Sequence, residues 1–445
     1  MEKFVIKGGK KLKGEISILG SKNVALKVLV AACLTNEEVI VENVPIISDF
    51  IIMANIIEHL GGEVKFNDHS VSVRLKEFSS EKISLAEAAE IRTSYMFLAP
   101  LLARMGKAII PNPGGCRIGA RPIDRIVDGL KKMGIKMKYD SGDGYFHAIA
   151  PRGLKGVKYT FEKNTHTGTE TMLLAAVLAK GKTILENAAQ EPEVDELIGL
   201  LNRMGAKITR EKPRTIVIKG VLNLHGTTFK IVPDRNEVVT FAVAAIITEG
   251  DILVKDINKK GIEEFLELLK FCGGGFKEEK NGIRFFYKGP LKATSVVTTF
   301  YPGIMTDWQG PFAVLMTKAK GQSTIHETVY ENRFTYVDEL RKMGAQIELY
   351  NPIINNPDKF YNFNIKDDNG KNFHAAKISG PTNLHDGVLD ISDLRAGATL
   401  VLAALAARGE SVLFGIEHLD RGYEQFDKRL KKLGANIKRV KEEIV

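Results

Sequence analysis

Two hydrophobic patterns alternate along this chain, one typical of buried helices and the other of amphipathic helices followed by strands. Segments rich in Ala and Leu are apolar on nearly every face, and they end at Gly106, Gly181, Gly250, Gly321 and Gly409. Each is followed by a short β-branched run such as 182–186, which predicts a strand. Helices without a polar face pack against one another, so we expect the amphipathic helices and the sheets to lie outside them.

A second pattern, a hydrophobic residue plus glycine at the end of an amphipathic segment, recurs six times. The glycines are Gly61, Gly134, Gly205, Gly273, Gly344 and Gly434. The first five are spaced by roughly 70 residues and the last gap is about 20 longer, a period that indicates tandem structural units. Glycine at this place predicts a helix C-cap in the left-handed conformation. Each unit reads helix, strand, helix, strand, strand.

This order of elements predicts an α/β fold that is not a regular doubly wound parallel sheet. The C-terminal unit stops at 435–438 without its final pair of strands, and the N-terminal strands, which precede any helix, can supply that pair. We therefore expect one domain over 22–230 and a second formed by 1–21 and 231–445. A ligand site between the two domains is expected.

Extra residues around 350–376 lengthen the last unit. They include 351–358 and 367–370, which are dense in Pro, Asn, Asp and Gly. Such residues predict a loop or an added hairpin. The pattern gives no function for this segment.

Composition narrows the class of protein. The net charge of +9 over 445 residues is spread along the chain without blocks of like charge, which favours a small anionic substrate over nucleic acid. The start of the chain lacks the apolar run of a signal peptide, and no window is long enough to span a membrane, so we expect a cytoplasmic protein. The three cysteines lack ligand-like spacing, so no metal site and no cofactor is predicted. No oligomeric state is predicted either.

The strongest candidate for chemistry is the glycine-rich stretch 113–124, which carries Cys116. Glycines let the backbone approach a ligand closely, and Arg117 and Arg121 favour bound anions and an available thiol. A lone cysteine commonly fills a core, and this is the interpretation for Cys33 and Cys272, which lie in or at the end of apolar helices.

Several charged residues are further candidates, each with a structural alternative. Lys22 at a helix N-terminus suits an anion, or is simply solvated. Arg92 begins an apolar helix and needs a partner or a ligand. Asp307 is a helix cap or a general base. Three arginines have an acid nearby and fall at equivalent unit edges, where they form structural ion pairs or bind a substrate with several negative charges: Arg333, Arg395 and Arg421.

Taken together, these residues resemble the UDP-N-acetylglucosamine 1-carboxyvinyltransferases, a branch of the enolpyruvyl transferase family. The resemblance spans nearly the whole chain and rests on the stretches 21–23, 115–124, 301–303, 331–334, 393–396 and 420–424 together with Arg92 and Asp307. It implies a two-domain inside-out α/β barrel architecture with three repeated units in each domain. It also implies transfer of the enolpyruvyl group of phosphoenolpyruvate to the 3-hydroxyl of UDP-N-acetylglucosamine, releasing phosphate, as the first committed step of peptidoglycan precursor synthesis.

The resemblance also implies roles for individual residues. Cys116 is the general acid that protonates the methylene carbon, and Asp307 takes the proton of the sugar hydroxyl. The phosphate and the carboxylate are held by Lys22, Arg121, Arg395 and Arg421, with Arg333 supporting them. Asn23, Arg92, Asp124 and Val329 contact the nucleotide sugar.

Two departures from the family pattern leave the acceptor open. The stretch 165–171 reads Thr-His-Thr-Gly-Thr-Glu-Thr, where the family has a loop of the type Ser-Val-Gly-Ala-Thr, and His166 is interpreted as an ordinary loop residue. Arg125 stands where the family has an apolar residue. The alternatives are a related UDP-sugar, shikimate 3-phosphate, or a non-catalytic paralogue that binds a UDP-sugar as a sensor.

Overall fold

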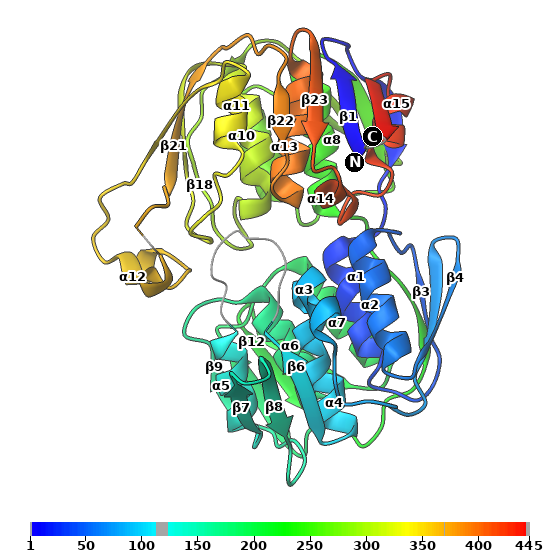
Figure 1. The fold of residues 1–445 in the computed structure, drawn as a ribbon. Helices are drawn as coiled ribbons and strands as arrows, with labels where there is room; N and C mark the ends of the chain where they lie inside the picture. Colours follow the sequence, from blue (N-terminus) through cyan, green and yellow to red (C-terminus); the bar gives the residue numbers. More distant parts are fainter. Residues whose placement is uncertain (1, 113–122, 369, 442–445) are drawn as a thin grey trace. The chain divides into compact units, whose positions relative to one another are not determined.

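The computed structural model describes residues 2–112, 123–368 and 370–441. These residues divide into two compact units. Unit 1 takes the described residues up to 18 and from 233 onward, and unit 2 takes those from 19 to 232. Each unit has its own continuous apolar core. Both are drawn in Figure 1.

Unit 2 is built from helices and three sheets in its described part: the mixed sheets β13-β3-β5-β4 and β11-β12-β10-β9, and the antiparallel sheet β6-β8-β7. Its helices are α1 (Lys22–Ala32), α2 (Ser48–His59), α3 (Leu85–Glu90), the 3-10 helix η1 (Arg92–Phe97), α4 (Leu98–Arg104), α5 (Asp124–Lys132), α6 (His166–Ala176) and α7 (Pro192–Arg203). Its strands are β3 (Val39–Glu42), β4 (Glu63–Asn67), β5 (Ser70–Arg74), β6 (Lys107–Pro111), β7 (Lys136–Asp140), β8 (Tyr145–Ile149), β9 (Lys158–Thr160), β10 (Lys182–Glu186), β11 (Lys207–Lys212), β12 (Thr215–Lys219) and β13 (Thr227–Lys230).

Unit 1 likewise has three sheets among its described residues, ordered β22-β23-β1-β24, β15-β16-β14-β2 and β17-β19-β21-β20, with β18 also paired to β19. Its helices are α8 (Arg235–Ile247), α9 (Glu263–Phe271), η2 (Thr306–Trp308), α10 (Gln309–Thr317), α11 (Val337–Lys342), α12 (Pro357–Phe360), η3 (Ile365–Asp367), α13 (Leu394–Ala406), α14 (Glu417–Asp420) and α15 (Phe426–Lys432). Its strands are β1 (Glu2–Lys7), β2 (Lys13–Ser17), β14 (Asp251–Lys255), β15 (Gly275–Glu279), β16 (Gly282–Phe286), β17 (Leu291–Lys292), β18 (Val296–Val297), β19 (Ala319–His326), β20 (Gln346–Tyr350), β21 (Ala375–Gly380), β22 (Val388–Asp390), β23 (Glu410–Phe414) and β24 (Asn436–Lys441).

The N-terminal strands complete sheets of unit 1. Strand β1 pairs antiparallel with both β23 and β24, so that Phe4 lies opposite Leu413 and Arg439. Strand β2 pairs parallel with β14, with Ile16 opposite Val254. The expected contribution of these strands to the last unit is therefore confirmed for β1.

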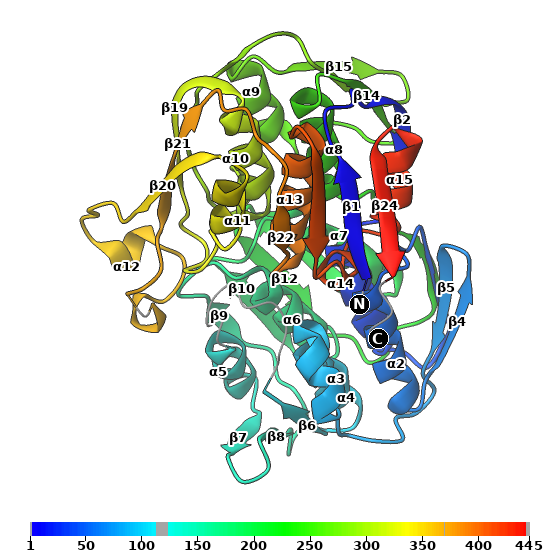
Figure 2. The same cartoon turned by 45° about the horizontal axis from the view of Figure 1, so that its top comes forward.

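Three helices without a polar face form the centre of unit 1. Every residue of α8 and of α10 is buried, and α13 is buried over all but two of its residues, Arg395 and Ala406. The three pack on one another, and Figures 1 and 2 show them surrounded by strands of the same unit. A helix that is apolar all round excludes water on every side, which places it at the core as the sequence predicts.

The six glycines at the ends of the amphipathic helices all adopt positive φ. The values lie between 89° and 98° for Gly61, Gly134, Gly205, Gly273, Gly344 and Gly434. This left-handed conformation is strained for residues with a Cβ, and it closes the helix by satisfying its last carbonyls. The predicted C-caps are confirmed.

The extra residues around 350–376 are not an added hairpin, and that alternative is wrong for the described residues. They contain the single turn of α12, the 3-10 turn η3 and irregular chain, before β21 begins at Ala375. Proline and asparagine at 356–357 start α12, and the Asn356 backbone is left-handed at φ 62°. Asparagine and aspartate side chains of the described part of the segment make local hydrogen bonds, as between Asn364 and Asp367.

Candidate active site

Asp307 lies at the centre of a charged cluster in unit 1. It sits in the 3-10 turn η2, which leads directly into the buried helix α10. Its Oδ1 accepts a hydrogen bond from Nη2 of Arg333 at 2.5 Å, and its Oδ2 lies 3.4 Å from Nη2 of Arg395. The Asp307 side chain is 25% exposed, whereas Arg333 and Arg395 are 5% and 11% exposed. A carboxylate held by two guanidinium groups thus faces solvent in this unit.

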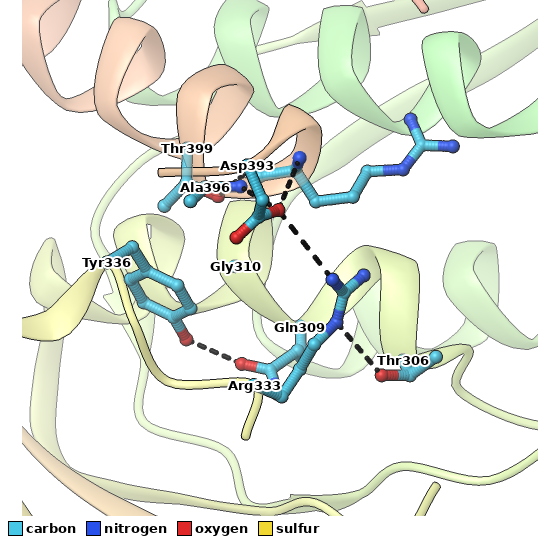
Figure 3. Close-up of a pocket in the computed structure, with 9 residues that line it drawn as sticks. Thr306, Gln309, Gly310, Arg333, Tyr336, Asp393, Ala396 and Thr399 are labelled. Carbon is cyan, nitrogen blue, oxygen red and sulfur yellow. Dashed lines mark hydrogen bonds and ion pairs between the residues drawn. The ribbon is translucent and has the colours of Figure 1, made fainter. Parts of the chain in front are cut away.

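Arg333 is fixed by two further groups. Its Nε donates to Thr306 Oγ1 at 3.3 Å, and its Nη1 lies 3.8 Å from Asp393 Oδ1 (Figure 3). Burial acts to lower the pKa of the Arg333 guanidinium, but the carboxylates of Asp307 and Asp393 outweigh burial and raise it. The side chain is therefore a permanent positive charge in a polar recess.

Arg395 comes from the first turn of α13. Asp393 caps this helix, because its Oδ1 accepts from the backbone N–H groups of Arg395 and Ala396 at 2.9 and 3.1 Å. The Arg395 guanidinium donates to Tyr423 Oη at 3.1 Å. Burial acts to lower the pKa of Arg395, while Asp307 and Tyr423 raise it further, so the pKa ends above its usual value.

A small recess opens between these groups. In the described part of unit 1 it is lined by Thr306, Gln309, Gly310, Arg333, Tyr336, Asp393, Arg395, Ala396 and Thr399. Hydroxyl, amide and guanidinium groups dominate this lining, so it suits a polar or anionic group rather than an apolar one.

Glu327, which the sequence reasoning missed, organises the floor of the recess. It is fully buried directly after β19. Its Oε2 accepts from Thr306 Oγ1 and Gln309 Nε2 at 2.9 and 2.8 Å. Its Oε1 accepts from the N–H groups of Val329 and Tyr330 at 2.7 and 3.1 Å. An acid that directly follows a strand and precedes the 331–334 stretch is the signal that could have pointed to it.

Two more residues that the sequence predicts for the site, Val329 and Arg421, are close in the sequence to members of this cluster. Val329 is half-buried and is tied to Glu327 through its backbone. Arg421 directly follows α14, is half-buried, and stands two residues before Tyr423, the partner of Arg395. Helix α14 packs on α13, the helix that carries Arg395.

Unit 2 holds the other predicted binding residues. Lys22 is the first residue of α1, and its Nζ bonds Asp49 Oδ2 on α2 at 2.6 Å, with both side chains largely buried. The alternative of a solvated lysine is therefore wrong. Ser21 stands at the N-cap position, but its side chain makes no capping hydrogen bond. Asn23 follows in the first turn and is half-buried.

Arg92 and Asp124 both begin helices of unit 2. Arg92 opens η1, with its guanidinium carbon 5.8 Å from the centre of the Tyr95 ring. Asp124 is exposed at the start of α5, and Arg125 beside it is half-buried. Cys116 and Arg121 lie outside the described residues.

The stretch 165–171 is a helix start rather than a loop, so the interpretation of His166 as an ordinary loop residue is wrong. Thr165 caps α6 by accepting from Gly168 N–H at 3.1 Å, and His166 is the first helical residue. His166 Nε2 lies 3.2 Å from Glu170 Oε1, and Lys27 Nζ of α1 lies 3.2 Å from Glu170 Oε2. Glu170 thus links α6 to α1 through Lys27 and also pairs with His166 one turn earlier on α6 itself.

Cys33 and Cys272 are buried, as predicted. Burial raises the pKa of the Cys33 thiol to about 12 and also raises that of Cys272. Both thiols donate to helix carbonyls, of Leu29 and Leu269, at 3.4 and 3.3 Å. Neither thiol is available for chemistry at neutral pH.

None of the helices in the described part of the chain is both long and apolar enough to cross a membrane.

Comparison with known proteins gives one consistent family. The family described as EPSP synthase (3-phosphoshikimate 1-carboxyvinyltransferase) matches residues 6–430. The UDP-N-acetylglucosamine 1-carboxyvinyltransferase of Methylacidiphilum infernorum is 41% identical over 445 residues, covering 99% of both chains. That of Bartonella henselae is 39% identical over 456 residues, covering 99% of this chain and all of the relative. Among solved structures, the enolpyruvyl transferase NikO from Streptomyces tendae has a TM-score of 0.85 at 24% identity, covering 99% of each chain.

Proposed function

Because the chain belongs to the enolpyruvyl transferase family, we propose that it moves the enolpyruvyl group of phosphoenolpyruvate onto the 3-hydroxyl of UDP-N-acetylglucosamine. The product side is inorganic phosphate and the enol ether that begins peptidoglycan precursor synthesis. The observation that carries this proposal is the Asp307 carboxylate, partly exposed and held between Arg333 and Arg395. The near-full-length similarity to relatives that carry this acceptor in their name supports it.

Asp307 serves as the general base in this proposal. It accepts the proton of the sugar hydroxyl while the hydroxyl oxygen bonds to C2 of phosphoenolpyruvate. Two adjacent guanidinium groups keep a carboxylate ionised and ready to accept a proton, but they also weaken it as a base. An incoming phosphate or carboxylate competes for Arg395, which releases part of this hold when substrate is present. Basicity would then rise only in the loaded site.

The acid for the first step is Cys116, which protonates the methylene carbon. In the second step the methyl carbon gives a proton back to the Cys116 thiolate, the bond between C2 and the phosphate oxygen breaks, and inorganic phosphate leaves as the double bond forms again. Cationic side chains stabilise the anionic tetrahedral adduct between the two steps and its phosphate leaving group. We assign this work to Lys22, Arg121, Arg395 and Arg421, with Arg333 supporting them.

Nucleotide-sugar recognition falls in this proposal to Asn23, Arg92, Asp124 and Val329. The residues divide between two domains, 22–230 and 1–21 plus 231–445, each of which we propose to be an inside-out α/β barrel of three repeated units. Lys22 is bound to Asp49, so a substrate phosphate has to share this ammonium or displace the carboxylate.

The acceptor is tested by phosphate release from phosphoenolpyruvate across a panel of acceptors. UDP-N-acetylglucosamine is expected to give the highest kcat/KM, ahead of other UDP-sugars and of shikimate 3-phosphate. A higher value with shikimate 3-phosphate would overturn the acceptor assignment. Tight binding of the UDP-sugar, without phosphate release from phosphoenolpyruvate in the presence of any acceptor, would favour the sensor alternative.

The acid is tested by two experiments on Cys116. The Cys116→Ala variant should release phosphate about a hundredfold more slowly or worse. An epoxide thiol reagent such as fosfomycin should label Cys116 before Cys33 and Cys272, because the latter two are buried with raised pKa values. Mass spectrometry that finds the label first on either buried thiol would contradict the assignment.

A further inference from the structure

The inserted segment, described over residues 351–368 and 370–374, contacts residues 326–328, where β19 ends and leads into the active-site cluster. Three hydrogen bonds between described residues join the two stretches. The Asn362 N–H donates to the Thr328 carbonyl at 2.8 Å, and the Glu327 N–H donates to the His374 carbonyl at 2.8 Å. The third joins the Tyr361 hydroxyl and His326 Nε2 at 3.0 Å. These bonds hold Glu327 itself and the residues on either side of it, His326 and Thr328.

Three aromatic side chains of the largely exposed segment are packed together and buried. The Tyr361 ring lies 4.8 Å from that of Phe363 and 5.1 Å from that of His374, measured between centroids, and all three side chains are nearly buried. His326 adds its ring 5.6 Å from Tyr361. The aromatic stack therefore includes the last residue of β19 as one of its members.

Polar side chains fix the returning end of the segment. His374 Nε2 lies 2.9 Å from Asp368 Oδ2, and Asn372 donates to the other oxygen of Asp368 at 2.9 Å. The Asn351 amide completes the frame, because it accepts from the His374 N–H at 2.8 Å and donates to the Asn372 carbonyl at 3.0 Å. These bonds hold the His374 carbonyl where Glu327 meets it.

Glu327 passes this constraint to the recess. Its carboxylate holds Thr306, the neighbour of Asp307 and a partner of Arg333. It also holds the backbone of Val329. A shift of the 326–330 chain by a fraction of an ångström would therefore move both the recess floor and Val329, and active-site geometry is sensitive to shifts of this size.

We infer that the inserted segment is a positioning element for the acceptor: it fixes residues 326–330 and so sets the affinity of the site for the sugar nucleotide. This inference rests on the proposed function, in which Val329 contacts that substrate. The segment does not touch the Asp307 carboxylate through any of the contacts described above, so its effect should fall on acceptor binding more than on the chemical step.

The test compares Tyr361→Phe and Asp368→Asn with Ile353→Ser, a change in the same segment at a fully exposed side chain. Tyr361→Phe keeps the stacked ring and removes only the hydroxyl that bonds His326. Loss of one such bond should raise the KM for UDP-N-acetylglucosamine, and its Kd by calorimetry, about threefold to tenfold. The kcat and the KM for phosphoenolpyruvate should stay within about twofold. Asp368→Asn should act in the same direction, and Ile353→Ser should match wild type.

An equal rise of both KM values, or an unchanged acceptor KM and Kd in both variants, would overturn the inference even if melting temperatures fall. The last pattern would leave the segment as a purely structural brace. The activity of the wild-type protein is measured first. If it releases no phosphate, the proposed function is wrong. If it is active and the acceptor KM and Kd are unchanged in both variants, only the positioning role is wrong. The calorimetric Kd reports on the segment in either case.

Discussion

Asp307 in unit 1 and Glu170 in unit 2 are both carboxylates held by two cationic partners, yet they have opposite exposure. Asp307 lies between Arg333 and Arg395 and is 25% exposed. Glu170 lies between His166 and Lys27 and has no exposed surface. The difference shows that pairing alone does not identify a reacting group. Access to substrate separates a carboxylate that does chemistry from one that holds helices together.

The two clusters also differ in what supports them. The partners of Asp307 come from a loop and from a helix N-terminus, and both arginines have further hydrogen-bond partners. The partners of Glu170 are the buried Lys27 of α1 and the half-buried His166 in the first turn of α6. Burial acts to raise the pKa of Glu170, but His166 and Lys27 outweigh it and lower that pKa. Removing one member of a buried ion pair costs free energy of folding, because the remaining charge is neither paired nor hydrated.

The largest effect is expected at Asp307. Asp307→Asn keeps an acceptor for Arg333 but cannot take a proton, so phosphate release should fall about 10²–10⁴-fold. The free energy of unfolding, from urea titration, should fall by less than in Glu170→Ala, because Arg333 keeps Asp393 and Arg395 keeps Tyr423 as partners. Asp338→Asn, the same exchange at a residue that is 79% exposed, is the control and should keep full activity. Turnover within tenfold of wild type would remove Asp307 from the chemical step.

The second effect should fall on stability rather than on turnover. Glu170→Ala leaves the nearly buried Lys27 without its carboxylate, so the free energy of unfolding should drop by about 3–5 kcal/mol. Glu162→Ala, at an exposed position of unit 2, should cost almost nothing. Replacing the pair together, as Lys27→Met with Glu170→Leu, should recover most of the loss because the buried Lys27 ammonium is then no longer left unpaired. A turnover loss in Glu170→Ala larger than its loss of folded protein would place Glu170 in the active site instead.

The smallest effect is a pH dependence of stability from His166. Burial acts to lower the pKa of its imidazole, but Glu170 outweighs burial and raises it above 6.5. A raised pKa stabilises the fold below the unfolded value and loses that contribution as pH rises through the folded value. Glu170, with its lowered pKa, contributes above 4.5 and loses that contribution as pH falls. The pair should therefore stabilise most between 4.5 and 6.5.

His166→Gln tests this window against wild type by urea unfolding. The stability gap between the two proteins should be larger at about pH 5.5 than at about pH 8. His225→Gln, at an exposed histidine of the same unit, should show no such change in the gap. A gap that is constant or grows towards high pH would mean that His166 is neutral in the folded state.

The sequence predicts the fold more completely than it predicts the contacts of the candidate site. Helix periodicity and the glycine C-caps follow from local chemistry, so Gly61 and its five counterparts were predictable one by one. The Asp307 partners were candidates because short motifs mark them. The pairs Thr306–Glu327, Lys22–Asp49 and Lys27–Glu170 could not be predicted in this way. Their members are 21, 27 and 143 residues apart in the sequence, and only the fold brings them together.

The pairing of β1 with β23 and β24 has a consequence for the order of events on the ribosome. Strand β1 leaves the exit tunnel before the other described strands, and its two neighbours are the last of the described strands to be synthesised. Unit 2, whose residues lie between, is complete long before them and can fold as an independent body during translation. Until β23 and β24 are synthesised, the backbone groups of β1 lack these two partners. In a nascent chain stalled after unit 2, α1 should therefore already be protected from proteases, whereas β1 should still be cleaved.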